Sequence, residues 1–190
     1  LTLEVPRGAT TISPILISLR DHPLLRRLCL RGHAIELTGL ENLLLSDTSN
    51  ITELDILRDH VSPRIIGLTR ILQALAQRPT PMTSLGLCCC PLNHDEVTLL
   101  RLALSNIPSL QSLLLTDGTL GSDELAQLAP ALYRNTSIKV LHLSGNDLND
   151  KESARLLRDI LRSNQTITTL DLSCNRFGKT TGAVECIADG

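Results

Sequence analysis

Aromatic residues are almost missing from this chain of 190 residues, which has one tyrosine (Tyr133), one phenylalanine (Phe177) and no tryptophan. Proteins that bind single-stranded nucleic acid stack bases on aromatic side chains, and those that bind the phosphate backbone are rich in Lys and Arg. The formal net charge here is −2 at pH 7. We therefore expect no nucleic-acid partner, and a core built from aliphatic side chains.

Long apolar runs are also missing. No stretch approaches the roughly 20 apolar residues that a membrane-spanning helix needs, and the first residues lack the charged and apolar segments of a signal peptide. The chain is 42% hydrophobic and 20% charged, as in ordinary globular domains. We expect no membrane partner, and an intracellular, cytoplasmic location.

The cysteines lack the spacing of a disulfide framework or of a C-x-x-C metal site. They are Cys29, Cys88, Cys89, Cys90, Cys174 and Cys186. No positive residue within the three-cysteine run lowers a thiol pKa, so these thiols are expected to be unreactive. We predict reduced thiols, no metal site and no cofactor.

What the sequence does contain is a repeated motif. Residues 138–148 follow the pattern L-x-x-L-x-L-x-x-N-x-L, and residues 167–177 repeat it. Such spacing is typical of a strand with alternate side chains in a core, followed by a turn. The first position recurs at Leu25, Ile51, Met82, Leu110, Ile138 and Ile167, a period of about 28 residues. A strand at residues 1–3 fits one period earlier, so we predict seven strands.

Helical spacing lies between the predicted strands, as at Leu125, Leu128 and Leu132. Residues that resemble N-caps or capping boxes predict three helix starts: Asn93 with Glu96, Ser122 before Asp123 and Glu124, and Asn149 with Glu152. The short unit from 25 to 50 leaves little room for a helix around 39–45. Parallel strands joined by right-handed crossovers stack into a curved solenoid. We predict an α/β fold with a parallel sheet on the concave side and helices on the convex side.

The motif runs from one end of the chain to the other. We expect a single domain over residues 1–190, with a partial repeat at 1–24, cut from a longer chain. Truncating a solenoid exposes apolar faces that end repeats would cover. Leu1 and Leu3 at one end, and Val184 and Ile187 at the other, are therefore expected to promote end-to-end self-association.

The repeats resemble the ribonuclease-inhibitor-like leucine-rich-repeat family, whose long units pair a strand with a full α-helix. The segments 135–138 (Asn-Thr-Ser-Ile) and 164–167 (Asn-Gln-Thr-Ile) also match the family's helix-to-strand junction. The resemblance implies a ladder of turn side chains at His33, Asp59, Cys90, Asn146 and Asn175, with Gly118 at the equivalent position of its own repeat. Gly118 has no side chain to satisfy backbone groups, so we expect the turn after Leu115 to be looser.

The concave face is the candidate binding surface. The phase of the motif selects Arg27, Arg31, Glu53, Asp55, Leu114, Val140, His142 and Asp171 as partner-binding residues. Arg27 and Arg31 are expected to face Glu53 and Asp55 on the next strand. These charges either satisfy one another or form a specificity rim around Leu114 as an apolar anchor.

Two other kinds of site are weighed against this surface. His142 and Asp171 stand at equivalent positions of adjacent strands, with Ser144 and Ser173 two residues further along, but an open surface is unlike the enclosed pockets of enzymes. We predict no catalytic residues.

Three N-x-[S/T] sequons, at Asn50, Asn135 and Asn164, share one repeat phase. They serve either the repeat turn or glycosylation.

The sequence thus favours a non-catalytic domain that binds a protein partner of unknown identity. Within the resembled family, innate-immune sensors and bacterial effectors carry such arcs. One alternative is a regulator of an enzyme, like the ribonuclease inhibitors or the Ran GTPase activators, with Arg27 or Arg31 as the functional arginine. A second alternative is an extracellular recognition domain, which the sequons favour and the unpaired cysteines oppose.

Overall fold

A computed structural model describes residues 2–5, 12–19, 22–32, 36–59, 65–77 and 81–177, with backbone alone for 2–5. His33, Cys186 and the predicted end residues Leu1, Val184 and Ile187 lie outside these ranges.

One parallel sheet of seven strands forms the centre of the molecule, and the strands follow in chain order. They are β1 (Thr2–Val5), β2 (Arg27–Gly32), β3 (Glu53–Arg58), β4 (Ser84–Cys88), β5 (Ser112–Thr116), β6 (Val140–His142) and β7 (Thr169–Asp171). Because neighbouring strands are parallel, each connection must return to the end of the sheet where the next strand starts. The predicted alternation of strands and helices with a parallel sheet is confirmed, and it fits a leucine-rich-repeat solenoid.

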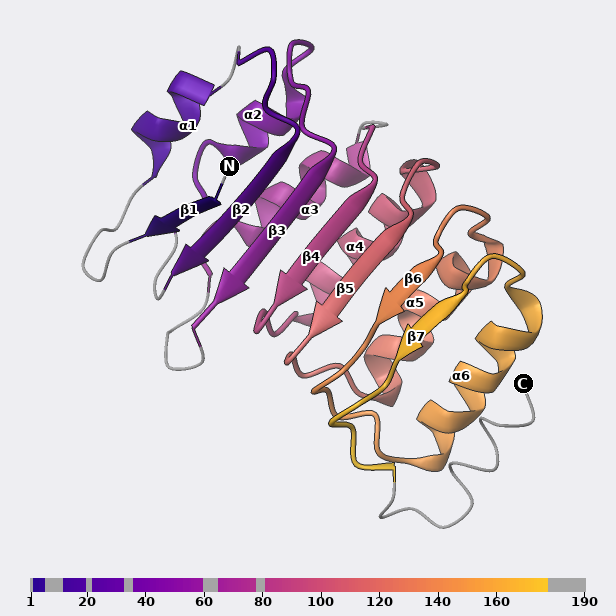
Figure 1. Cartoon of the computed structure of the whole chain (residues 1–190). Coiled ribbons are helices and arrows are strands. Elements are labelled where there is room, and N and C mark those ends of the chain that lie inside the picture. The colour runs from indigo at the N-terminus through magenta and orange to yellow at the C-terminus, as the bar shows by residue number, and fades with distance from the viewer. Residues whose placement is uncertain are drawn as a thin grey trace.

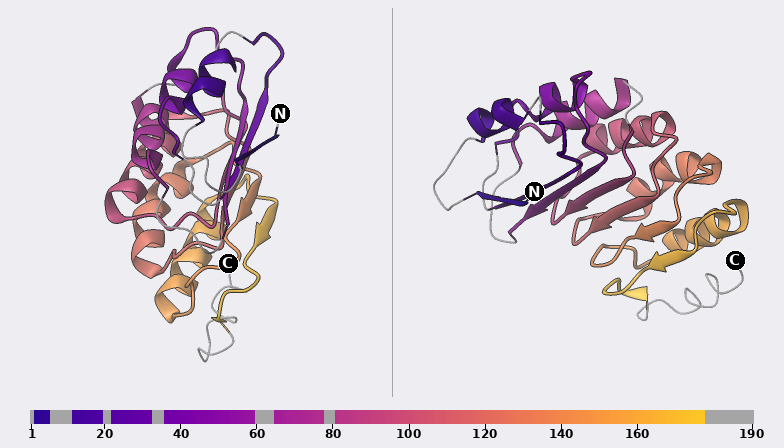
Figure 2. Two further views of the ribbon diagram at one scale, coloured as in Figure 1. Left: turned by 90° about the vertical axis from the view of Figure 1, so that its left-hand side faces the viewer. Right: turned by 45° about the horizontal axis from the view of Figure 1, so that its top comes forward.

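Within the described residues, six helices make these return connections, and all lie on one side of the sheet (Figures 1 and 2). They are α1 (Ser13–Leu19), α2 (Leu40–Leu45), α3 (Leu68–Gln77), α4 (His94–Asn106), α5 (Ser122–Arg134) and α6 (Lys151–Ser163). The short unit still forms a helix, α2, of 6 residues, compared with 13 in each of α4, α5 and α6. We call the other side of the sheet the open face.

The core lies between the sheet and the helices. Strand residues alternate between buried and partly exposed, so that Leu113 and Leu115 of β5 are buried while Leu114 is partly exposed. Leu125 and Leu128 of α5 are also fully buried. Burying one such side chain contributes roughly 1.5–3 kcal/mol. This aliphatic layer, repeated in every unit, holds the sheet and helices together.

Capping side chains set the helix starts. Asn93 Oδ1 accepts a hydrogen bond from Glu96 N–H, and Glu96 Oε2 accepts one from Asn93 N–H, which is the predicted capping box of α4. The other two predictions are wrong by one residue. Gly121, not Ser122, caps α5, and Asp150, not Asn149, caps α6.

The shift at α6 has a simple cause. Asp150 Oδ1 accepts hydrogen bonds from both the N–H and the hydroxyl of Ser153, at 2.7 and 2.6 Å. The carboxylate thus satisfies one of the unpaired N–H groups at the helix start. The neighbouring Glu152 instead pairs with Arg155.

Candidate functional site

Side chains on the open face form three rows that cross the strands, because the register aligns equivalent positions of consecutive repeats. From β2 to β7 the first row contains Arg27, Glu53, Ser84, Ser112, Val140 and Thr169. The second contains Cys29, Asp55, Gly86, Leu114, His142 and Asp171. The third contains Arg31, Leu57, Cys88 and Thr116. All eight candidate partner-binding residues stand in these rows.

Arg27 is paired with acidic side chains of the next strand. Its Nη2 lies 2.9 Å from Asp55 Oδ2, and its Nε lies 3.6 Å from Glu53 Oε2. The hydrogen bond that Arg27 donates to Asp55, followed by the negative charges of Asp55 and Glu53, raises the pKa of Arg27. These side chains therefore satisfy one another at the β2–β3 end of the open face.

Arg31 has a different partner from the one that the sequence predicts. The register places Arg31 opposite Leu57, so it does not face Glu53 or Asp55. Its Nε instead lies 4.0 Å from Asp59 Oδ1, just after β3. Both side chains are well exposed, at 59% and 37%, so this pair adds little stability.

Gly86 makes room for Asp55 on the neighbouring strand. A Cβ placed on Gly86 would lie 2.5 Å from Asp55 Oδ1. The Asp55 side chain is only 14% exposed, because it lies across the sheet above this glycine. Asp55 is therefore a largely covered group of the β2–β3 end.

At the other end of the second row, Leu114, His142 and Asp171 stand on adjacent strands. All three are partly exposed. Asp171 Oδ1 accepts a hydrogen bond from Ser173 N–H at 2.9 Å. Hydrogen bonds from the backbone and hydroxyl of Ser173 lower the pKa of Asp171, and the charge of His142 contributes to the same direction. Asp171 is therefore an ionised carboxylate next to His142 and two strands from Leu114.

Burial disfavours the thiolate form of the three consecutive cysteines. Burial raises the pKa of Cys88 and of Cys89, and it raises the pKa of Cys90 to about 12. Of the five described cysteines, Cys88, Cys90 and Cys174 are free thiols. Only Cys174 among these five is exposed.

The turns after β4 to β7 share one backbone conformation. Cys89, Asp117, Gly145 and Cys174 have positive φ angles of 55°, 53°, 68° and 57°. Each directly precedes the turn position of its own repeat. The left-handed region favours glycine, yet only one of the four is glycine. Repeat geometry therefore imposes this conformation on side chains that disfavour it.

Asparagines at the turn position join consecutive repeats. Asn146 Nδ2 donates to Leu115 O at 2.7 Å and to Leu143 O at 3.0 Å, and Asn146 Oδ1 accepts from Leu120 N–H at 3.2 Å. Asn175 Nδ2 donates in the same way to Leu143 O, at 2.7 Å. Each amide thus bonds its own turn and the preceding one.

Cys90 occupies the same place with a weaker donor. Its Sγ lies 3.6 Å from Ile56 O and 3.2 Å from Cys88 O. A thiol has one hydrogen, so it serves these two carbonyls less well than an amide. Asp59 differs again, because it follows β3 directly and Arg58 before it lacks a positive φ.

The turn at Gly118 has the same backbone conformation as its neighbours at the preceding residue. Asp117 has the shared left-handed φ, and its N–H donates to Ser144 O at 2.9 Å. The missing side chain instead leaves a cavity with about 10 Å³ of room, lined in part by Leu87, Gly118 and Asn146. That is space for one water molecule at most.

Two of the three sequons are used by the helix-to-strand junction. Asn135 Oδ1 accepts from Ser137 N–H and Ile138 N–H at 2.9 and 2.7 Å. Asn164 Oδ1 accepts from Thr166 N–H, and its Nδ2 donates to Leu132 O at 2.9 Å. Asn164 is buried, and Nδ2 is the atom to which a glycan would be joined. The folded structure therefore uses Asn164 as a turn residue.

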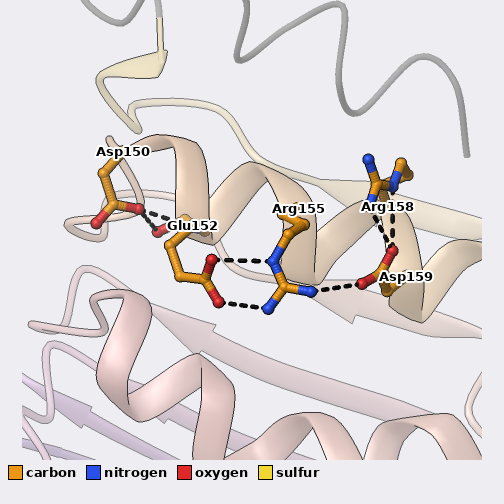
Figure 3. A network of polar contacts seen from close by, with 6 residues as sticks. Asp150, Glu152, Arg155, Arg158 and Asp159 are labelled. Carbon is orange, nitrogen blue, oxygen red and sulfur yellow. Dashed lines mark hydrogen bonds and ion pairs between the residues drawn. The ribbon is translucent and has the colours of Figure 1, made fainter.

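The helix side carries a separate network of charges on α6 (Figure 3). Arg155 Nε lies 2.9 Å from Glu152 Oε2, and its Nη1 lies 3.1 Å from Asp159 Oδ2. Arg158 Nη2 reaches Asp159 from the other side, at 2.8 Å. The basic and acidic groups of this helix thus bind one another along its outer surface.

A cavity of about 500 Å³ separates the short helices α1 and α2. It is lined by Ser13, Leu16, Ile17, Thr38, Gly39, Asn42, Leu43, Leu45 and Ser46. None of these side chains is ionisable, so the cavity offers no acid–base group.

Within the described ranges, no group of three or more His, Cys, Asp or Glu residues is placed to hold a metal ion. None of the described helices is both long and apolar enough to cross a membrane.

Comparisons with known proteins agree with this architecture. A family model described as "Leucine Rich repeat" matches residues 134–151 and 163–180. Among solved structures, the chain is similar to "Leiomodin-1 Actin-Binding Site 2 (ABS2)", with a TM-score of 0.60 and 15% sequence identity. That match covers 80% of this chain and 88% of the other. No curated protein matches the chain in a sequence search. These results support a leucine-rich-repeat family, and the structural match concerns the fold alone.

Proposed function

We propose that this chain is a non-catalytic protein-interaction domain whose open, concave face contacts the partner. The observation that carries the proposal is the open face itself. Its three rows of side chains stand on a rigid sheet, with Leu114 partly exposed near the centre and polar groups around it. An apolar centre with a polar rim is the usual anatomy of an interface.

The finer assignment is a right-handed solenoid of the ribonuclease-inhibitor-like type, with about seven repeats. Its support is the pairing of a strand with a helix of 13 residues in the units of α4, α5 and α6. We propose an intracellular location on the basis of the free thiols of Cys88, Cys90 and Cys174. The buried amide of Asn164 supports the same location.

The eight candidate residues contribute differently in this proposal. Leu114 and Val140 supply apolar contact, while His142 and Asp171 supply polar contact. Arg27, Glu53 and Asp55 are already bound to one another, and Arg31 lies beside Asp59. We assign these four a role in shaping the edge of the interface rather than its centre.

A matched pair of substitutions tests which face is used. Leu114→Arg places a charge on the open face, and Leu102→Arg places the same charge on the helix side, where Leu102 is 41% exposed. Proteins retained by the immobilised chain are identified by mass spectrometry, and the most abundant specific partner is then purified for calorimetry. We expect Leu114→Arg to weaken binding at least tenfold and Leu102→Arg to leave it unchanged. The reverse pattern would show that the helix side binds the partner.

Monomeric actin is a defined first partner to measure, because the solved domain of similar fold is named an actin-binding site. Calorimetry with purified actin would give a dissociation constant for the unmodified chain. Loss of that binding in Leu114→Arg would place actin on the open face. No binding would leave the interaction function to another protein.

A further inference from the structure

The β4–β7 part of the open face differs from the β2–β3 part in the size of its side chains. Its positions hold Ser84, Gly86, Cys88, Ser112, Leu114, Thr116, Val140, His142, Thr169 and Asp171. Long flexible side chains lose rotamer freedom when an interface forms. Arg27, Arg31 and Glu53 on β2 and β3 carry that cost, whereas the small side chains on β4–β7 do not.

The apolar contact on this part of the face is narrow. Leu114 on β5 and Val140 on β6 are both partly exposed, and Val140 pairs in register with Ser112, the residue two before Leu114. Hydroxyl groups of Ser112 and Thr116 flank Leu114 along its own strand. One aliphatic side chain of a partner therefore fits here better than a broad apolar surface.

The ionisable side chains on this part of the face include His142, which stands between Leu114 and Asp171 in the second row. None of the ten positions is Lys or Arg, and Asp171 is the one carboxylate among them. Asp117, which is exposed, adds a second negative charge just beyond the end of β5. Lys139 lies at the opposite edge, before β6 begins. By contrast, the acids of β3 are bound by Arg27.

We propose that strands β4–β7 of the open face bind a partner segment that places an aliphatic side chain on Leu114 and a Lys or Arg on Asp171. This inference rests on the proposed interaction function and adds the chemistry of the partner. Leu114 and Asp171 stand two strands apart in one row, which corresponds to roughly 10 Å. The aliphatic and basic groups of the partner must therefore lie about this far apart. The β2–β3 charges lie outside the contact.

A random dodecapeptide library displayed on phage is a suitable probe, panned against the full chain and followed by affinity measurement on the recovered peptides. We expect the recovered peptides to contain Lys or Arg near an aliphatic residue. Asp171→Asn and Leu114→Ser should each weaken their binding about tenfold. The matched changes on the helix side, Asp123→Asn and Leu102→Ser, should leave it unchanged. Circular dichroism melting of each variant checks that the fold is kept.

The salt dependence of binding is a second measurement, and a change in structure alone would not alter it. Binding of the unmodified chain should weaken from low to high ionic strength, and Asp171→Asn should flatten that dependence. Recovery of neutral or acidic peptides would overturn the basic-partner inference and leave the open-face function standing. The same conclusion would follow if Asp171→Asn kept full affinity while Leu114→Ser lost it. Loss of binding only in Leu102→Ser would overturn both. Recovery of no peptide above bare support would also overturn the inferred partner chemistry.

Discussion

The side-chain amide of Asn146 donates a hydrogen bond to the carbonyl oxygen of Leu115 at 2.7 Å, and so joins two consecutive turns. The same amide bonds Leu143 O and accepts from Leu120 N–H. Asn146 is only 4% exposed. These hydrogen-bonding groups are therefore largely shielded from bulk water in the folded protein.

Asn146→Ala should lower the free energy of unfolding by about 2–3 kcal/mol, since it leaves buried backbone groups unpaired. Chemical denaturation measures this value. Asn42→Ala, at an exposed position of α2, is the control and should change it by less than about 0.5 kcal/mol. Equal losses in both variants would mean that the turn hydrogen bonds do not join the repeats energetically.

Gly145 is the turn residue least tolerant of a side chain. Its φ is +68°, and an added Cβ would lie 2.2 Å from Asp117 Oδ1 and 3.1 Å from Asp117 Cα. Gly145→Ala should cost about 2 kcal/mol or more, from left-handed strain and displacement of Asp117. The control Gly121→Ala, at φ −109°, has no left-handed strain and should cost about 0.5–1 kcal/mol, because Ala is a poorer N-cap residue than Gly. A thermal melt of both variants distinguishes them, and similar melting temperatures would contradict the close approach.

Thiol labelling should follow burial. Cys174 is exposed, while burial raises the pKa of Cys90 to about 12. Iodoacetamide at pH 8 should label Cys174 in the folded protein and leave Cys90 unlabelled until the chain unfolds, because only the thiolate reacts. Peptide mapping by mass spectrometry, with and without denaturant, gives the two rates. Rapid labelling of Cys90 without denaturant would show that the turn opens in the native state.

The cap of α6 makes part of the stability dependent on pH. Burial raises the pKa of Asp150, but hydrogen bonds from Ser153 outweigh it and bring the pKa below its ordinary value of 3.8. A lowered carboxyl pKa contributes stability that is complete above the unfolded-state value and is lost as the pH falls through the folded-state value.

Asp150→Ala should therefore cost about 1 kcal/mol at neutral pH, and this difference from the unmodified chain should shrink as the pH falls below 3.8. Urea unfolding at a series of pH values measures it. Asp123→Ala, which removes an exposed carboxylate from the first turn of α5, is the matched control. A constant difference across the series would mean that the carboxylate is not the capping group.

The hydrophobic period of the sequence was sufficient to predict the parallel sheet, its strand order and its open-face rows. A strand exposes alternate side chains, so a motif repeated about every 28 residues places the same positions side by side. Cys29, Asp55, Gly86, Leu114, His142 and Asp171 accordingly stand in one row. The aliphatic core followed from the same pattern.

Only the tertiary structure determined which hydrogen-bond and ion-pair partners the polar side chains bind. Arg31 lies beside Asp59 because the register places Leu57 opposite it. Asp150 caps α6 because Ser153 lies within reach of its carboxylate. The turn at Gly118 has the backbone conformation of its neighbours because backbone hydrogen bonds join the turns of consecutive repeats. Apolar burial depends on position along the chain, which a sequence shows. Hydrogen bonds are sensitive to differences in distance of a few tenths of an ångström, which only the packed repeats establish.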